Sequence, residues 1–178
     1  KKISEKYGAK VPFLRSKSLS GDYTSTKDVL IDFVKKIDNK NVDIVFCLYP
    51  TSPLLSYRDL TLSLKSFLKK KVDCLLPVSK HRSSPLRSLF VNKKGFINFI
   101  FKKFQNFRSQ DLRELYYDTG TFYIYKKKKL LKNKFKVFPP KTTSYILDNL
   151  RTIDINEPKD FKDVQLIYKF LIKKLIIK

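Results

Sequence analysis

A strand–helix–strand succession between residues 42 and 79 constrains the fold of this chain more than any other feature. Residues 42–50, VDIVFCLYP, form a continuous apolar run rich in β-branched and aromatic side chains, typical of a strand buried on both faces. Residues 57–70 carry leucines and Phe67 at helical spacing, and residues 72–79, VDCLLPVS, form a second apolar run. The short links between these segments predict a βαβ unit, which implies a parallel sheet.

The flanking segments extend this unit to one α/β domain over residues 1–178, with no internal repeat and no linker. The other expected elements are a helix end at 1–7 capped by Gly8, a short strand at 9–14, a capped amphipathic helix within 18–37, two short strands turning at Lys94-Gly95 within 87–101, β structure at 118–125, a short strand at 136–140 and a terminal helix from Asp160.

The formal net charge of +23 suggests nucleic acid or another polyanion as a partner. Its distribution favours a different interpretation. Most of the excess is lysine spread over the whole chain, and the runs at 69–71 and 126–129 fall at the ends of helical or strand patterns, where they form solvated faces. Because no nucleic-acid-binding motif accompanies them, we expect no specific nucleic-acid partner. A non-catalytic basic module that binds polyanions is the alternative, and weak polyanion affinity follows from the charge in either case.

The two cysteines, Cys47 and Cys74, lie in apolar runs without a second thiol or a histidine at ligand spacing. They are therefore expected to be reduced core residues of a cytoplasmic protein. We see no signal peptide and no uninterrupted apolar run of membrane-spanning length, so we expect no membrane partner. The chain contains no methionine and opens on KKISEKYGAK, which looks like a helix already under way. We therefore expect that N-terminal residues are missing.

Loops that follow strands are the places to search for a site, because ligands of parallel α/β sheets bind beyond the carboxyl ends of the strands. Residues 49–55, YPTSPLL, offer the hydroxyls of Thr51 and Ser52, although a proline-stiffened loop that caps the next helix explains them equally well. Residues 79–90, SKHRSSPLRSLF, hold His81, Arg82 and Arg87. A lone histidine is weak evidence for catalysis, whereas two arginines suggest an anionic ligand, with solvent-exposed charge as the alternative.

A third segment, residues 107–124, FRSQDLRELYYDTGTFYI, contains Arg108 before Asp118 and Gly120. Arg108 has the planar fork that binds a carboxylate, and Gly120 permits a sharp turn or close approach of a ligand to the backbone. The alternative is a turn that leads into a strand.

The last candidate is RTIDINEPKDF at residues 151–161. Asp154 and Asn156, two positions apart in an extended segment, would share one face and could hold Mg²⁺, which takes only one or two protein carboxylates. The alternative is helix capping, with Asn156 as N-cap, Pro158 in the first turn and Asp160 at the positive end of the helix. Both can hold at once, because a carboxylate and an adjacent cap residue can share a metal.

Five segments occur in the order and spacing of one protein family: KYGAKVPFLRSKSLSGDYTST, CLYPTSPLL, RSQDL, YYDTGTFYI and IDINEPKDF. Nearly the whole chain resembles the acylneuraminate cytidylyltransferases, and most closely the branch that makes CMP-pseudaminic acid. The resemblance implies a Rossmann-like nucleotidyltransferase (GT-A-like) three-layer α/β fold with a mostly parallel sheet. It also implies Mg²⁺-dependent transfer of CMP from CTP to the anomeric hydroxyl of a nine-carbon 2-keto sugar acid, for surface glycan biosynthesis, by a homodimer. A sialic or legionaminic acid is the alternative substrate.

The same resemblance assigns roles to individual residues of this chain. It puts three residues on the nucleotide side, namely Arg15, Asp22 and Thr26. It puts the remaining substrate-binding residues around the sugar and the α-phosphate, namely Tyr49, Thr51, Ser52, Arg87, Arg108, Gln110 and Asp118. Asp154 matches the first aspartate of the family's DID metal motif and is the expected catalytic residue.

Two departures from the family pattern accompany these assignments. The second metal aspartate of the motif is Asn156 here, and its carbonyl oxygen can ligate Mg²⁺ but adds no charge, so we expect weaker metal affinity. The family's first strand and its glycine-rich and basic triphosphate loop would lie upstream of Lys1. We therefore expect an N-terminally truncated fold that shows little activity unless upstream residues exist.

Overall fold

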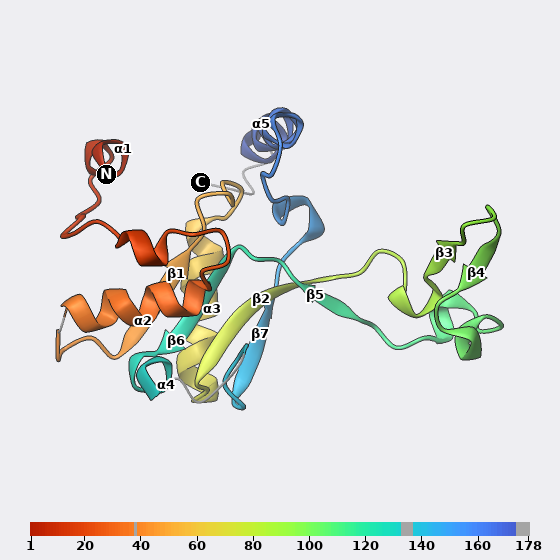
Figure 1. Ribbon diagram of the computed structural model, residues 1–178, viewed down its shortest axis with the longest axis horizontal. Coiled ribbons are helices and arrows are strands. Elements are labelled where there is room, and N and C mark those ends of the chain that lie inside the picture. Colours follow the sequence, from red (N-terminus) through yellow and green to blue (C-terminus); the bar gives the residue numbers. More distant parts are fainter. Residues whose placement is uncertain (38, 133–136, 174–178) are drawn as a thin grey trace.

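The computed structural model describes residues 1–37, 39–132 and 137–173, and it is built around a five-stranded sheet (Figure 1). The sheet contains β1 (Ile44–Leu48), β2 (Cys74–Lys80), β5 (Tyr116–Asp118), β6 (Phe122–Lys126) and β7 (Thr142–Ile146). The helices are α1 (Lys2–Lys6), α2 (Thr26–Ile37), α3 (Tyr57–Lys70), α4 (Lys127–Lys132) and α5 (Pro158–Lys173). Short 3-10 turns are η1 (Lys17–Leu19), η2 (Pro85–Arg87), η3 (Lys102–Phe104), η4 (Ser109–Asp111) and η5 (Asn149–Arg151).

Helices cover both faces of the sheet, because successive side chains of a strand point to opposite sides. On one face Cys74 and Tyr125 pack with α2 and α4, whereas on the other face Leu75 and Ile124 pack against Phe67 of α3. This arrangement is the three-layer α/β architecture that the sequence predicts. No helix within the described ranges is long and apolar enough to cross a membrane.

The prediction of a mostly parallel sheet is wrong for the pairing of neighbouring strands. The order is β1-β6-β2-β5, and each of these neighbours pairs antiparallel, whereas β7 pairs parallel with β2. Strands β1 and β2 do run in the same direction, as a βαβ unit requires, but β6 inserts between them. The pattern of residues 42–79 predicts that β1 and β2 run in the same direction. It gives no information about β6, which begins more than 40 residues after the end of β2.

Several local predictions are confirmed. Helix α3 covers the predicted residues and begins with a capping box, in which Ser56 and Asp59 bond each other's backbone amides. The predicted hairpin is present as β3 (Leu89–Val91) and β4 (Ile97–Phe99), with Gly95 at a positive φ in its turn. Each of these elements is specified by residues that are close in the sequence.

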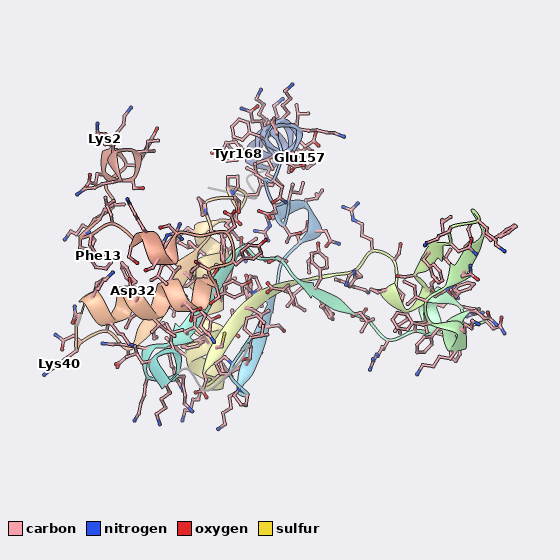
Figure 2. All side chains as sticks on the ribbon, viewed as in Figure 1. Lys2, Phe13, Asp32, Lys40, Glu157 and Tyr168 are labelled. Carbon is pink, nitrogen blue, oxygen red and sulfur yellow. The ribbon has the colours of Figure 1, made fainter. Side chains whose placement is uncertain are left out.

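The strand predicted at residues 9–14 is wrong. This stretch pairs with no strand among the described residues and instead lies against α2, where the rings of Phe13 and Phe33 are 5.5 Å apart (Figure 2). The strand predicted at 136–140 is also absent from residues 137–140, while residue 136 lies outside the described ranges. Prolines at positions 12, 139 and 140 remove the backbone donors that a strand needs.

An arm formed by residues 82–115 projects from the end of β2 and returns through β5 (Figure 1). It contains the β3–β4 hairpin and η2, η3 and η4. None of its side chains belongs to the three buried clusters of the described chain. Its exposed large apolar side chains are Leu89, Phe90, Val91, Phe96, Ile97, Ile100, Phe101 and Phe107.

Asp73, which precedes β2, is buried between two lysines that extend from β6 and α4. Its carboxylate lies 3.5 Å from Nζ of Lys126 and 3.0 Å from Nζ of Lys129, and its backbone carbonyl accepts the Lys126 amide at 3.0 Å. Burial tends to raise the pKa of Asp73, but the two ammonium groups outweigh it and lower this pKa. The ionised form therefore stabilises the fold.

We predict that Asp73→Asn lowers the free energy of unfolding at neutral pH by about 1–3 kcal/mol, because two ammonium groups lose their carboxylate. The pKa of Asp73 is lower in the folded state than in the unfolded state. The extra free energy of unfolding of the native chain is therefore fully present above the unfolded-state pKa of about 3.9, and it is lost as the pH falls through the folded-state pKa. Urea unfolding at a series of pH values measures both effects. The control is the exposed Asp163→Asn, and an equal loss in both variants would contradict the prediction.

Candidate active site

The carboxyl ends of β1, β2 and β7 lie at one edge of the sheet, because all three strands run in the same direction. The loops beyond them are joined by hydrogen bonds. Ser79 Oγ at the end of β2 donates to the Leu147 carbonyl at 2.9 Å, and the Tyr49 amide donates to the Thr121 carbonyl at 3.0 Å. The loops after the strands therefore meet where a ligand of an α/β sheet is expected.

The loop after β1, residues 49–55, is anchored at both ends. The hydroxyl of Tyr49 is hydrogen-bonded to Oγ1 of Thr26 at the start of α2. The backbone carbonyl of Tyr49 accepts a hydrogen bond from the Ser52 amide at 3.3 Å, which closes a turn. Further along the loop, the side chain of Leu54 is fully buried. Two predicted site residues, Thr26 and Tyr49, are thus in direct contact although they are 23 positions apart.

Tyr123 on β6 is a residue that the sequence reasoning missed. Its hydroxyl donates to Asp118 Oδ2 at 2.8 Å, while Oδ1 of the same carboxylate accepts the Gly120 amide at 2.9 Å in a turn where Gly120 has a φ of +61°. The Tyr123 ring meets Tyr49 edge-on, with centroids 5.8 Å apart. Tyr123 therefore links Asp118 to the Tyr49–Thr26 pair, and the alternation of tyrosines in β6 is the sequence signal that could have found it.

The two tyrosines of this group do not ionise easily. Burial is the main cause that raises the pKa of Tyr123, and its bond to Asp118 raises it further. Burial also raises the pKa of Tyr49, although the hydrogen bond with Thr26 opposes it. Both phenols are therefore neutral near pH 7, so they act as hydrogen-bonding groups that orient neighbours and not as general bases.

Residues 153–156, after η5, alternate between partly buried and exposed side chains. Ile153 and Ile155 pack with Leu54 of the first loop and with Val164 of α5. Asp154 and Asn156 are exposed, and neither side chain forms a hydrogen bond or ion pair within the described ranges. Both side chains therefore have unoccupied oxygen acceptors, and their sharing of one metal-binding face stays a prediction.

Helix α5 begins at Pro158, so Asn156 is not its N-cap as the alternative supposed. Asp160 satisfies the free amides instead, because its Oδ2 accepts the amides of Asn156 at 2.9 Å and Glu157 at 2.8 Å. These two backbone bonds lower the pKa of Asp160. Capping therefore uses Asp160 and leaves the side chain of Asn156 available for a ligand.

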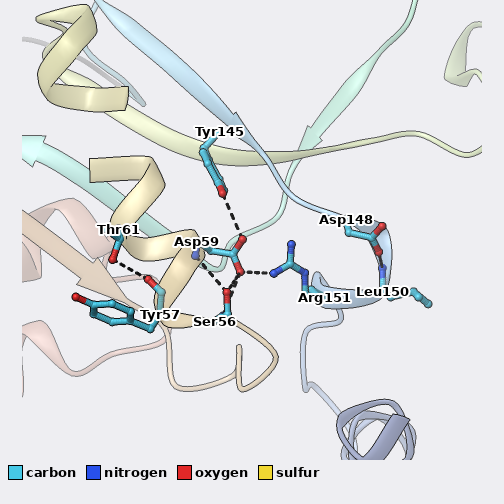
Figure 3. A network of polar contacts seen from close by, with 8 residues as sticks. All are labelled: Ser56, Tyr57, Asp59, Thr61, Tyr145, Asp148, Leu150 and Arg151. Atoms are coloured by element: carbon cyan, nitrogen blue, oxygen red, sulfur yellow. Dashed lines mark hydrogen bonds and ion pairs between the residues drawn. The ribbon is translucent and has the colours of Figure 1, made fainter. Parts of the chain in front are cut away.

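A buried carboxylate connects the segment of Asp154 to the first loop (Figure 3). Asp59 is 3% exposed, and its Oδ2 accepts the Ser56 amide at 3.1 Å and the Ser56 hydroxyl at 2.6 Å. The same oxygen pairs with the guanidinium of Arg151, and Oδ1 accepts the Tyr145 hydroxyl at 3.3 Å. We call these four residues the Asp59 network. The sequence reasoning missed it, although Ser56 and Asp59 have the spacing of a capping box.

The side-chain oxygens at this edge provide only part of a binding site for a divalent cation. Among the described residues no group of three or more His, Cys, Asp and Glu side chains could hold a metal ion. Asp154 and Asn156 offer one carboxylate and one amide oxygen on a single face. This set fits Mg²⁺ because that ion keeps several waters and takes other ligands from substrate phosphates.

The remaining predicted residues are Arg87, Arg108 and Gln110 of the arm and two residues that precede α2. Arg87 and Arg108 belong to the arm, where Arg87 Nη1 donates to Ser109 Oγ at 3.3 Å and Arg108 pairs with Asp111 at 3.1 Å. Gln110 is an exposed neighbour of Arg108 in the same arm. Arg15 and Asp22 are exposed between α1 and α2. Within the described chain no hydrogen bond or ion pair joins these five residues to Tyr49, Asp118 or Asp154.

Comparison with known proteins identifies the family. A pseudaminic acid cytidylyltransferase of Campylobacter jejuni is 31% identical over 169 residues, which are 94% of this chain and 72% of that protein. The chain belongs to the pseudaminic acid cytidylyltransferase family. An N-acylneuraminate cytidylyltransferase of Streptococcus agalactiae is 26% identical over 90% of this chain and 39% of its own length. No protein-family model matches the chain.

Solved structures support the fold of a cytidylyltransferase. A CMP:2-keto-3-deoxy-manno-octonic acid synthetase in complex with CTP covers 94% of this chain and 76% of its own, with a TM-score of 0.62 and 14% identity. A 4-diphosphocytidyl-2C-methyl-D-erythritol synthase of Anaerococcus prevotii covers 93% of this chain and 74% of its own, with a TM-score of 0.55 and 16% identity. The predicted family and the predicted nucleotidyltransferase fold are thus confirmed.

We predict that Arg151→Gln lowers the free energy of unfolding by about 2–4 kcal/mol, because it leaves the buried carboxylate of Asp59 without its cation. The matched control is Arg108→Gln, which breaks an exposed ion pair and should cost less than about 0.5 kcal/mol. Urea unfolding of both variants tests this. Similar losses in the two would show that the Asp59 network does not hold the edge together.

Proposed function

We propose that this chain transfers CMP from CTP to the anomeric hydroxyl of a nine-carbon 2-keto sugar acid and releases pyrophosphate, as a step in surface glycan biosynthesis. One observation carries this proposal. In this member of the cytidylyltransferase family, the segments that contain Tyr49, Asp118 and Asp154 lie together at the edge where the parallel strands end. The contacts of the loops after β1, β5 and β7 support one site that spans nucleotide and sugar.

The reaction requires positioning more than covalent chemistry from the protein. The anomeric oxygen attacks the α-phosphorus of CTP, a new P–O bond forms, and the bond from the α-phosphorus to the bridging oxygen of pyrophosphate breaks. The hydroxyl loses its proton, and pyrophosphate carries away the bonding electrons. A site for this displacement must align two oxygens about phosphorus and neutralise negative charge.

Asp154 is the proposed catalytic residue, and with Asn156 it is the proposed holder of Mg²⁺. Their outward oxygens, unoccupied by other side chains of the described ranges, support this assignment. Bound there, the ion would supply positive charge to the phosphate oxygens. The single formal charge of the pair agrees with the expectation of weaker metal affinity than a site with two aspartates.

The other proposed contacts divide between the two substrates. The nucleotide side comprises Arg15, Asp22 and Thr26. The sugar side at this edge comprises Tyr49, Thr51, Ser52 and Asp118. The hydrogen bond between Thr26 and Tyr49 supports a common site, because it holds the start of α2 against the loop after β1. Tyr123 orients Asp118 and is a positioning residue.

Pseudaminic acid is the proposed sugar. The C. jejuni pseudaminic acid enzyme matches at 31% identity over 72% of its length, whereas the S. agalactiae N-acylneuraminate enzyme matches at 26% over 39% of its length. A CMP-N,N'-diacetyllegionaminic acid synthase of Legionella pneumophila is 27% identical over 69% of its length. Sialic and legionaminic acids are the alternatives that a substrate comparison would separate.

We propose the cytoplasm as the location, without a membrane or a specific nucleic acid as partner. The free thiols of Cys47 and Cys74 support a reducing compartment.

A homodimer built on the arm would complete the site. Eight large apolar side chains of the arm are 44–67% exposed, which is more apolar surface than a short projecting segment usually shows to water. Arg87, Arg108 and Gln110 lie on this arm, away from Asp154 of the same chain. In a dimer that buries the arm, these three residues would reach the sugar acid bound by the other subunit.

We predict that Asp154→Asn lowers kcat for pyrophosphate release by on the order of 100-fold, because the site loses its negative charge for the cation. The assay uses the protein with any residues that precede Lys1 in the native chain, and it offers CTP, Mg²⁺ and either pseudaminic or N-acetylneuraminic acid. Asp163→Asn on the exposed face of α5 is the matched control and should keep full activity. Unchanged turnover in Asp154→Asn would refute the catalytic role of this residue.

We predict that Val91→Ser with Ile97→Ser converts a dimer to a monomer, because each replaced side chain is 67% exposed in the single chain and would be buried in the dimer. Sedimentation analysis measures the change. The control is Phe161→Ser with Leu166→Ser on α5, whose side chains are 51% and 65% exposed. A native chain that sediments as a monomer at micromolar concentration would exclude the proposed dimer.

A further inference from the structure

A polar cavity of about 560 Å³ lies where the arm joins the sheet. Two chain segments form its walls, residues 80–84 after β2 and residues 109–115 before β5. They are held together by the His81 amide, which donates to the Leu115 carbonyl at 3.0 Å. None of Thr26, Tyr49, Asp118 and Asp154 lines this cavity, so it is separate from the edge where the loops of the candidate active site meet.

The charges of the cavity leave two arginines without an acidic partner. Glu114 is the acidic residue of its lining, and both of its oxygens are occupied, one by the ion pair with Lys80 and the other by the Tyr116 hydroxyl at 2.8 Å. Arg82 and Arg113 also line the cavity, and neither forms an ion pair or hydrogen bond within the described ranges. The lining therefore carries excess positive charge in the form of two guanidinium groups.

One wall of the cavity contains a buried hydroxyl. Ser84 Oγ is shielded from solvent and has no hydrogen-bond partner in the described part of the chain. Buried hydroxyls are nearly always paired, so an acceptor is expected in reach of this group. His81 stacks on Tyr117, with ring centroids 5.0 Å apart, and thereby gives one wall a fixed shape.

We propose that this cavity, which we call the neck site, binds the oxyanion of a small metabolite, a phosphate or a carboxylate. Guanidinium groups match such oxyanions in a bidentate manner. The volume falls within the range of small-molecule sites. Gln110 also lines the cavity, so an occupied neck site would include one of the residues proposed to contact the sugar acid.

The test is calorimetric titration of inorganic phosphate and, separately, of citrate, at physiological ionic strength and with saturating CTP present. CTP removes the nucleotide-binding residues from the measurement. We expect Arg82→Gln with Arg113→Gln to weaken the binding of at least one probe tenfold or more. The control, Arg58→Gln on the exposed side of α3, should change the binding less than twofold. The preferred probe distinguishes a phosphate from a carboxylate ligand.

A second pair of substitutions distinguishes specific binding of the oxyanion by the guanidinium groups from attraction by positive charge alone. Arg82→Lys with Arg113→Lys keeps the charge and removes the planar fork, and we expect it to weaken binding about fivefold. Equal binding by the native chain and the Gln variant, or an equal loss in Arg58→Gln, would overturn the neck site. Pyrophosphate release from CTP by the same variants reports on the proposed function independently, because the Asp154 edge is unchanged.

Discussion

The arrangement of the candidate site depends on one buried charge, the carboxylate of Asp59. It lies in the first turn of α3, yet it pairs with an arginine 92 positions later in the chain. Removing a carboxylate and a guanidinium from water is costly, and the cost is offset here because Ser56 and Tyr145 complete the hydrogen bonds of the acid. Through this pair the segment that carries Asp154 is held against the loop after β1.

The position of Asp154 then follows from the geometry of an extended chain. Because Ile153 and Ile155 are held against Leu54, the side chain of Asp154 between them and that of Asn156 after them are expected to face the opposite way. Two oxygen-bearing groups thus face solvent at the edge where β1, β2 and β7 end. The use of Asp160 as the helix cap leaves both groups free. Packing, capping and the ion pair therefore act together to present a small set of acceptors.

Local patterns predicted much of this fold. Helix α3, the β3–β4 hairpin and the paired faces of residues 153–156 each follow from side chains within a few positions of one another. The insertion of β6 between β1 and β2 could not be predicted in this way, because it depends on pairing across the whole arm. The short apolar stretch at 9–14 has strand-like composition but finds its partner in the Phe33 side of α2. Apolar content alone does not distinguish these outcomes.

The assignment of the site residues stays a prediction. The structure brings Thr26 into contact with Tyr49 and leaves Asp154 and Asn156 exposed. The arm placed Arg87 and Arg108 far from them, since the direction of a long excursion is set by tertiary structure that no local motif encodes. Tyr123 and Arg151 were missed because their importance lies in partners distant in the sequence.

The central claim is the formation of a phosphate ester between CMP and a nine-carbon sugar acid, and phosphorus NMR of the reaction mixture tests it most directly. The protein, together with any residues that precede Lys1 in the native chain, is incubated with CTP, Mg²⁺ and pseudaminic acid, and the spectrum is followed with time. The account predicts a new phosphodiester resonance that grows together with an equal amount of pyrophosphate and requires the sugar acid. Pyrophosphate without the diester, or CTP that stays intact with each of pseudaminic, sialic and legionaminic acids, would contradict it.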